Sequence, residues 1–269
     1  MPGLAIFTSL FSRHRTVRYG EHGCQRADLH LPTGPGPHPL AVVIHGGSWR
    51  ATFGKIVMRP VCADLARRGW AAWNIEYRRI GRGQGGGWPA TFEDVASAID
   101  HLALLDAPVD LGRVVFVGHS AGGQLALWAA GRHRLPDGAP GAGPGVAPIA
   151  AVSLAGVNDL GSVHRETGGG AVGHLMGGSP ERHPDRYAVG DPILAAPLDL
   201  PVLLVHGTDD QTVSVRRSRD YLAAAGPGAD VELVEIPGAA GRHRSQIDPA
   251  GPGWAAAAVW LERFRPVPA

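Results

Sequence analysis

Short runs of Val, Ile and Leu alternate along the chain with longer segments in which apolar residues recur at helical spacing. Most of the runs are apolar throughout, which is typical of strands buried on both faces of a sheet. The alternation predicts an α/β fold with a mostly parallel central sheet and helices on both faces. The expected strands are 27–31, 40–45, 71–77, 113–118, 149–155, 201–206 and 230–236. The expected helices are 57–68, 91–105, 121–132, 213–225 and 253–264.

Three segments interrupt this alternation. Residues 81–89 and 136–148 are rich in Gly and Pro and are expected to be loops. Residues 156–200 lack strand character and contain the stretch TGGGAVGHLMGG. Because long connections inside compact domains are often functional, we expect a small lid or substrate-binding insertion there. No linker divides the chain, so residues 1–269 are expected to form a single domain.

The helix expected at 91–105 opens with TFED. This stretch resembles a capping box, in which a Thr side chain caps the helix and an acidic side chain three residues later reaches back. We therefore expect Thr91 to be the N-cap, with Asp94 in place of the usual Glu.

Composition and charge narrow the classes of function. The chain has 269 residues, a formal net charge of +1 and 18% charged residues, so neither nucleic acid nor an anionic membrane is an expected partner. Cys24 and Cys62 match no disulfide framework or zinc spacing and are expected to be free thiols. The N-terminal apolar run lacks a preceding basic residue and a cleavage site, and no window reaches the length of a membrane span. We expect a soluble, cytoplasmic protein.

A candidate nucleophile follows one of the expected strands. The stretch VVFVGHSAGG runs from an apolar strand into G-x-S-x-G at 118–122, and a helical segment starts immediately afterwards. This strand–turn–helix context favours Ser120 as a nucleophile on a sharp turn, with the Ala121 N–H directed at a developing oxyanion. The alternative is a Gly-rich turn with an incidental serine.

A second Gly-rich turn lies in the stretch VVIHGGSW, residues 42–49. Such a turn after an earlier strand can present backbone N–H groups to the same oxyanion. Gly47 is the first choice of donor and Ser48 the second, whereas His45 is expected to anchor the loop. By itself the stretch is equally compatible with a plain turn between a strand and a helix.

HGGSW together with GHSAGG resembles the α/β-hydrolase superfamily. Within it, the chain is most similar to small esterases and arylformamidases with an HGGxW signature, including the kynurenine formamidase group. ARRGWAAWNIEYRR, GGWPATFEDVASAIDHL and HGTDD extend the resemblance through most of the chain. The resemblance implies an α/β-hydrolase fold and a serine hydrolase that uses a Ser-Asp-His triad without a metal or cofactor.

The resemblance also implies that the acid and then the base follow the nucleophile along the chain. HGTDDQTV matches the family form H-G-x-x-D-x-x-V, which selects Asp210 over Asp209 as the acid, with Asp159 a distant third. Asp209 and Asp210 are otherwise expected as turn or cap residues. His243 is the only histidine after Asp210 and is therefore the expected base. Its loop is about two residues longer than in the usual sequence pattern of the family.

The substrate is less constrained by the sequence. Trp49, Trp88 and Met176 are candidates for an apolar, partly aromatic pocket wall, and packing in the core is the alternative for Trp88 and Met176. We expect a serine hydrolase that cleaves a small aryl or short-acyl ester. The alternatives are an arylformamidase acting on N-formylkynurenine and a catalytically silent binding protein with the same fold. The expected partner is a small-molecule ester or formamide, and a homodimer is compatible with the sequence.

Overall fold

The computed structural model describes residues 14–265, whose eight strands form one sheet in the order β1-β2-β4-β3-β5-β6-β7-β8. The pairs β1/β2 and β2/β4 are antiparallel, and the pairs from β4 to β8 are parallel. The mostly parallel sheet predicted from the sequence is therefore confirmed. The strands are β1 (Arg15–Arg18), β2 (Arg26–His30), β3 (His38–Ile44), β4 (Ala71–Ile75), β5 (Val109–His119), β6 (Ala150–Leu154), β7 (Val202–Gly207) and β8 (Val231–Ile236).

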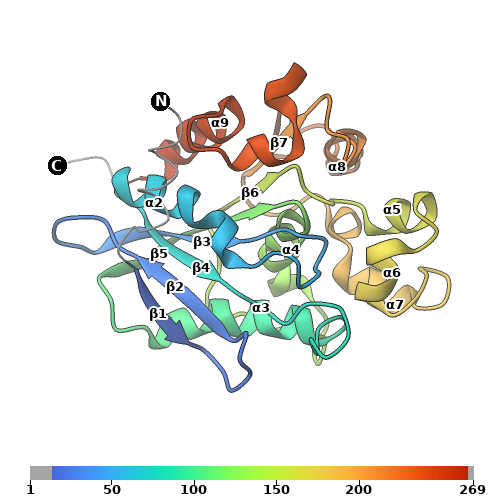
Figure 1. Ribbon diagram of the computed structural model, residues 1–269, viewed down its shortest axis with the longest axis horizontal. Helices are drawn as coiled ribbons and strands as arrows, with labels where there is room; N and C mark the ends of the chain where they lie inside the picture. The colour runs from blue at the N-terminus through green and yellow to red at the C-terminus, as the bar shows by residue number, and fades with distance from the viewer. Residues whose placement is uncertain (1–13, 266–269) are drawn as a thin grey trace.

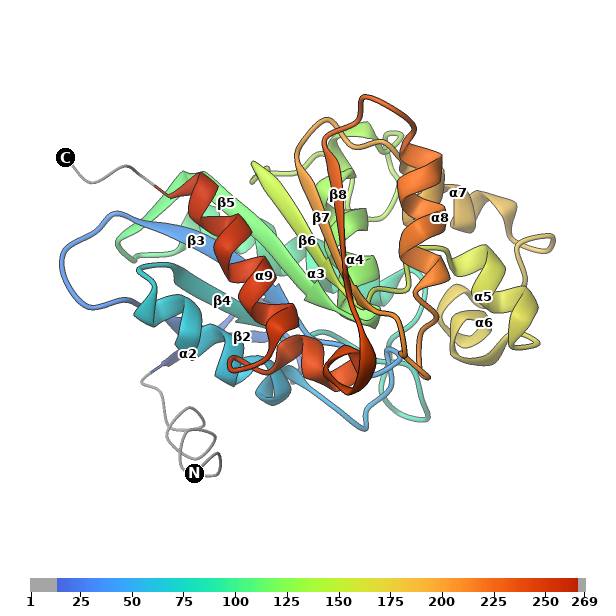
Figure 2. The ribbon, with the colours of Figure 1, turned by 90° about the horizontal axis from the view of Figure 1, so that it is seen from above.

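Helices cover both faces of the sheet. In Figure 2, α9 and α2 lie in front of the sheet and α3 and α4 behind it. Alternate residues of the central strands point to the two sides, so the side chains of β3 divide between two apolar clusters. Helices were expected at each of these places. They are α2 (Arg59–Arg67), α3 (Ala90–Asp100), α4 (Ala121–Ala130), α8 (Arg216–Ala225) and α9 (Pro252–Leu261).

The expected insertion at 156–200 folds into short helices. They lie together at one end of the molecule, beside α8 (Figure 1), and Figure 2 places them in the same position. The side chains of Leu160, Val172 and Leu175 are buried in the same apolar cluster as one face of the sheet, so the insertion shares its core. The helices are α5 (Leu160–Glu166), α6 (Gly170–Met176), α7 (Pro184–Gly190) and the 3₁₀ turn η4 (Pro192–Ala195).

The expected capping box at the start of α3 is wrong. The N-cap is Pro89, and Thr91 lies within the first turn. The Thr91 hydroxyl accepts a hydrogen bond from the Gly87 N–H (2.9 Å) and donates one to the Arg78 carbonyl (2.7 Å). Asp94 forms an ion pair with Arg78 (2.7 Å) instead of reaching back to the helix start. Both polar side chains therefore fix the preceding loop rather than the helix end.

Other expectations concern the thiols and membrane spans. Cys24 is half-buried and Cys62 is buried, and both are free thiols, as expected. Within residues 14–265, none of the helices has the length and apolar character required to cross a membrane.

A buried ion pair fastens the antiparallel edge of the sheet to the loop that follows β3. Asp28 on β2 is fully buried and accepts hydrogen bonds from Lys55 Nζ, Thr16 Oγ1 (2.7 Å) and Arg59 Nη2 (3.0 Å). Burial alone would raise the pKa of Asp28, but the hydrogen bonds from Lys55 and Thr16 lower it to about 2. Because the pKa of an unfolded Asp is about 3.9, this stabilisation is complete above that pH and is lost as the pH falls through about 2.

We expect Asp28→Asn to lower the free energy of unfolding by about 3 kcal/mol at pH 7, because Lys55 is left without its counter-charge. Urea denaturation followed by circular dichroism measures the change. Asp137→Asn is the matched control, since Asp137 is exposed on a loop. The wild type should lose more stability than Asp28→Asn between pH 5 and pH 2. Equal stability of the wild type and Asp28→Asn at pH 7 would show that the Asp28 ion pair does not stabilise the fold.

Candidate active site

Ser120 occupies a strained turn between the end of β5 and the start of α4. Its φ and ψ are 56° and −120°, a conformation that costs a non-Gly residue about 1–3 kcal/mol. The flanking glycines are required by close packing: a Cβ on Gly118 would lie 1.9 Å from the Gly122 carbonyl oxygen, and one on Gly122 would lie 2.1 Å from the Ile44 carbonyl oxygen. The turn predicted for G-x-S-x-G is therefore present, and it brings α4 directly against β3.

His243 and Asp210 are joined by a hydrogen bond. His243 Nδ1 donates to Asp210 Oδ2 at 2.7 Å, which leaves Nε2 as the basic nitrogen of the ring. The other carboxylate oxygen of Asp210 accepts the N–H groups of Thr212 (2.8 Å) and Val213 (3.0 Å). His243 and Ser120 line the same cavity. The structure thus brings together the three side chains that the sequence selected.

The side chain of Asp210 is fully buried, and its carboxyl group is held in its ionised form. Burial alone would raise its pKa, but nearby His206 (Nε2 3.6 Å from Oδ2), the hydrogen bond with His243 and the Val213 N–H hold the pKa well below its usual range. The competing acids lie elsewhere. Asp209 is exposed, and Asp159 caps α5 by accepting the N–H of Ser162 at 2.8 Å.

The loop that carries His243 passes tightly against the end of β7. A Cβ on Gly207 would lie 1.5 Å from the carbonyl oxygen of Gly241, so the two backbones are in direct contact. The preceding 3₁₀ turn η5 (Gly238–Gly241) exposes Ala239 and Ala240 to solvent. The loop therefore bulges outward at Ala239 and Ala240, and His243 reaches Asp210.

Backbone N–H groups surround Ser120 on two sides. Gly46, Gly47 and Ser48 line the cavity together with Ser120, and Ala121 is the first residue of α4. Among the residues that the structure describes, the N–H groups of Gly47, Ser48 and Ala121 have no hydrogen-bond acceptor. Gly47 and Ser48 have φ values of 116° and 52°, so this loop has a conformation that favours glycine. These N–H groups are available to a developing oxyanion.

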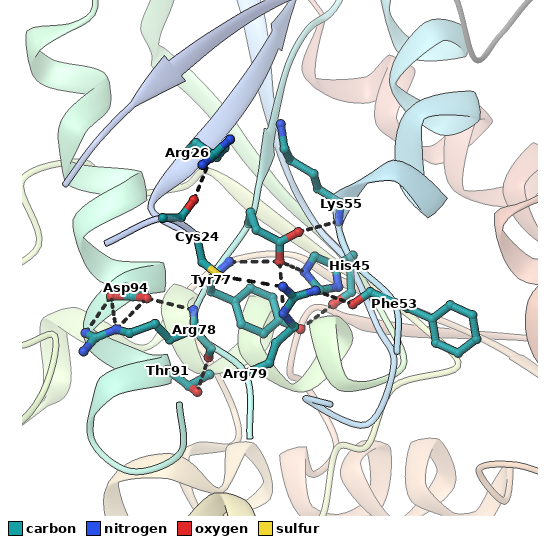
Figure 3. Close-up of polar contacts among 12 residues, drawn as sticks. Cys24, Arg26, His45, Phe53, Lys55, Tyr77, Arg78, Arg79, Thr91 and Asp94 are labelled. Atoms are coloured by element: carbon teal, nitrogen blue, oxygen red, sulfur yellow. Dashed lines mark hydrogen bonds and ion pairs between the residues drawn. The ribbon is translucent and has the colours of Figure 1, made fainter. Parts of the chain in front are cut away.

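A buried polar network holds the loop that contains Gly47 and Ser48 (Figure 3). His45 Nε2 lies 2.7 Å from Glu76 Oε1, and the Tyr77 ring stacks on His45 at 4.4 Å. The second oxygen of Glu76 accepts the Lys55 N–H at 3.1 Å, and Arg79 donates to the Phe53 carbonyl at 2.8 Å. Burial alone would raise the pKa of Glu76, but the hydrogen bond with His45 lowers it. His45 thus anchors the loop, and Glu76 is its partner, which sequence reasoning missed.

His119 was also missed, although it lies inside the G-x-S-x-G motif. Its Nε2–H donates to the His243 carbonyl at 3.0 Å, and the two rings lie 4.7 Å apart. Burial, with a smaller contribution from His243, lowers the pKa of His119 to about 3, so the ring is neutral near pH 7. A Cβ on Gly46 would lie 3.1 Å from His119 Nδ1. His119 therefore contacts both the loop that carries His243 and the loop after β3.

The cavity at Ser120 has a volume of about 280 Å³. Phe53, Val57 and Ile247 supply apolar wall, and Thr52 and Thr212 supply hydroxyl groups. Arg50 and Arg244 also line the cavity and give it positive charge. No group of three or more His, Cys, Asp or Glu side chains within residues 14–265 is placed to hold a metal ion.

The three side chains expected to form the pocket wall do not line this cavity. Trp49 is buried and donates from Nε1 to Gln124 at 3.1 Å. Trp88 packs edge-on against Phe92 at 5.2 Å, and Met176 is fully buried in the core. Trp49 follows the loop of N–H groups directly in sequence, but its positive φ of 55° turns the chain there, and its side chain packs in the core.

A mostly parallel sheet with a sharp serine turn after β5, an acid after β7 and a histidine after β8 defines the α/β-hydrolase fold. The chain belongs to the BD-FAE family, whose model matches residues 27–224.

Named relatives include several esterases. Esterase LipC of Mycobacterium tuberculosis is 27% identical over 274 residues, and the alignment covers 93% of this chain but 64% of that protein. Among solved structures, a truncated carbohydrate esterase from gut microbiota has a TM-score of 0.79 at 22% identity, covering 95% of this chain and 97% of that one. A thermophilic esterase, Est2, from the Planctomycetes species Thermogutta terrifontis has a TM-score of 0.73 at 22% identity, covering 95% and 94%. These structural similarities establish the fold.

Proposed function

We propose that the protein is a carboxylic ester hydrolase in which Ser120 is the nucleophile, His243 the base and Asp210 the acid. The observation that carries the proposal is the 2.7 Å hydrogen bond between His243 and Asp210 beside a cavity that also holds the strained Ser120. A serine at such a turn, with an imidazole oriented by an ionised carboxylate, is the arrangement required for acyl transfer. The esterases among the relatives support the same reaction class.

The reaction proceeds through an acyl-enzyme. Ser120 Oγ attacks the ester carbonyl carbon while its proton passes to His243 Nε2, and Asp210 stabilises the resulting imidazolium. The C–O bond to the leaving group breaks as Nε2 returns that proton to the leaving oxygen. Water then attacks the acyl–Ser120 ester and gives a proton to Nε2. That proton passes back to Ser120 Oγ as the carboxylic acid departs.

The oxyanion formed in both halves of the reaction needs donors that are fixed in place beforehand. The N–H groups of Gly47, Ser48 and Ala121 supply them, because these groups have no acceptor among the described residues. Donors that need no reorganisation contribute about 3 kcal/mol each to the stabilisation of such a transition state.

The dimensions of the cavity favour a small substrate. About 280 Å³ with apolar wall at Phe53, Val57 and Ile247 suits a short acyl or aryl group. The test is a panel of p-nitrophenyl esters of graded acyl length, with a feruloyl ester and N-formylkynurenine included. We expect turnover to be highest for the short acyl chains. Hydrolysis of N-formylkynurenine well above that of p-nitrophenyl acetate would identify an arylformamidase, and absence of turnover throughout would identify a silent binding protein.

Gly46→Ala is expected to lower kcat for p-nitrophenyl acetate by about 100-fold, which is the scale of losing one oxyanion donor. The added Cβ would lie 2.7 Å from the His119 carbonyl oxygen and 2.8 Å from Ser120 Cβ, so the loop after β3 must move away from the nucleophile. Steady-state kinetics measure the change. Gly23→Ala is the control, because a Cβ there meets its nearest neighbour only at 3.9 Å. Unchanged kcat in Gly46→Ala would show that catalysis does not depend on the present position of the loop after β3.

A further inference from the structure

Two cationic side chains, Arg50 and Arg244, line the cavity at Ser120. Arg50 and Arg244 are both exposed, and neither has an ion pair with any residue between 14 and 265. The cavity lining contains no Asp or Glu. Nearby Arg79 differs, because it is paired with Glu76 at 3.6 Å. The net charge of the chain is only +1, so this local excess of positive charge is not a property of the whole surface.

Arg244 is held in place by an aromatic ring. Its guanidinium carbon lies 5.5 Å from the centre of the Phe53 ring, within the range of a cation–π contact. A guanidinium that stacks through its face keeps its N–H groups, which lie in its plane, free for a carboxylate. Burial and the charge of His243 are the main causes that lower the pKa of His119. Asp210 opposes them and Arg244 adds a smaller lowering, so Arg244 lies near the loops that carry Ser120 and His243.

The two arginines come from the two loops that would carry the reaction. Arg50 closes the turn of N–H groups by donating from its backbone to the Gly47 carbonyl at 2.9 Å. Arg244 directly follows His243 in the 3₁₀ turn η6 (His243–Ile247). An ester at Ser120 therefore lies between a loop that binds its oxyanion and a loop that protonates its leaving group, and each loop adds one unpaired guanidinium.

We propose that the preferred substrates are small esters that also carry an ionised carboxylate, which Arg50 and Arg244 bind. This inference rests on the proposed ester hydrolysis and names its substrate class. A carboxylate is planar and matches the forked geometry of a guanidinium, and such charge-assisted hydrogen bonds are about twice as strong as neutral ones. The carboxylate belongs to the acyl group or to the leaving group, and the experiment separates these two cases.

The test uses two pairs of acid and methyl ester. In the first pair, mono-4-nitrophenyl adipate carries the carboxylate on its acyl group, and its methyl ester is the neutral counterpart. In the second pair, 4-carboxyphenyl acetate carries the carboxylate on its leaving group, and its methyl ester is again neutral. Each kcat/KM is divided by the rate of hydroxide-catalysed hydrolysis, so that intrinsic reactivity cancels. We expect the carboxylate to be favoured by about tenfold or more in one pair, and 0.5 M NaCl to reduce that preference several-fold.

The double variant Arg50→Gln/Arg244→Gln is expected to reduce the ratio of carboxylate to methyl ester turnover by about tenfold. Arg242→Gln is the matched control. Arg242 and Arg244 lie on either side of His243 in the sequence, and both are exposed. Only Arg244 lines the cavity. The control is expected to keep both the ratio and the turnover of neutral esters.

The outcomes separate this inference from the proposed function. Hydrolysis of the neutral esters with no preference for the carboxylate, or a preference that survives in the double variant, overturns the inference and leaves ester hydrolysis standing. Loss of the preference in Arg242→Gln to the same extent also overturns it, because the effect is then one of overall charge. No turnover of any of the four esters overturns ester hydrolysis and the inference together.

Discussion

Ser120→Ala is expected to lower kcat for p-nitrophenyl acetate by about 10⁴-fold or more, with little change in the thermal melting curve. The variant loses the atom that forms the acyl-enzyme, while the strained turn and its close glycine contacts keep their shape. Steady-state kinetics and circular dichroism on the same preparation measure the two quantities. The residual rate reports what the oxyanion donors and the cavity contribute without a nucleophile.

Ser245→Ala is the matched control for this experiment. Ser245 lies two residues after His243 in η6 but does not line the cavity. The control should keep its activity within about twofold, as is usual for a change outside the site. Activity of Ser120→Ala within tenfold of the wild type would contradict a nucleophilic role for Ser120.

Asp210→Asn is expected to lower kcat by about 10³- to 10⁴-fold. The Asp210 carboxylate accepts a hydrogen bond from His243 Nδ1–H at 2.7 Å, whereas an amide that presents its NH₂ group to Nδ1 favours the tautomer with the proton on Nε2. That tautomer cannot accept the Ser120 proton. Asp209→Asn makes the same change one residue earlier, at an exposed position, and is expected to leave kcat unchanged. The opposite pattern, with Asp209→Asn impaired and Asp210→Asn active, would move the acid to Asp209.

Chain order and local patterning predicted the fold and the residues that meet at the site. The apolar runs that became β3, β5, β7 and β8 are parallel strands, so the residues that follow them meet at the same edge of the sheet. Ser120, Asp210 and His243 each follow such a strand. Their order along the chain was therefore sufficient to predict that they lie close together.

The supporting contacts depend on register, which the sequence alone did not specify. Ile44 and Ile75 are paired across β3 and β4, so His45 and Glu76, each one residue later, lie side by side. Equal offsets from the two strand ends were a signal for this pair. The pocket wall was harder to predict, because a position next to a motif does not show which way a side chain points. Trp49 therefore turned into the core, and Phe53 was overlooked.

Covalent labelling by a fluorophosphonate is the most direct test that Ser120 is an activated nucleophile. Such a probe reacts with a serine that a neighbouring base has activated, so it depends on the nucleophile and on the His243–Asp210 pair together. We expect mass spectrometry to find one adduct, on the peptide that contains Ser120. It should be absent in Ser120→Ala and form much more slowly in Asp210→Asn. An unlabelled wild-type protein, or an adduct on another residue in a protein that hydrolyses esters, would contradict this role of Ser120.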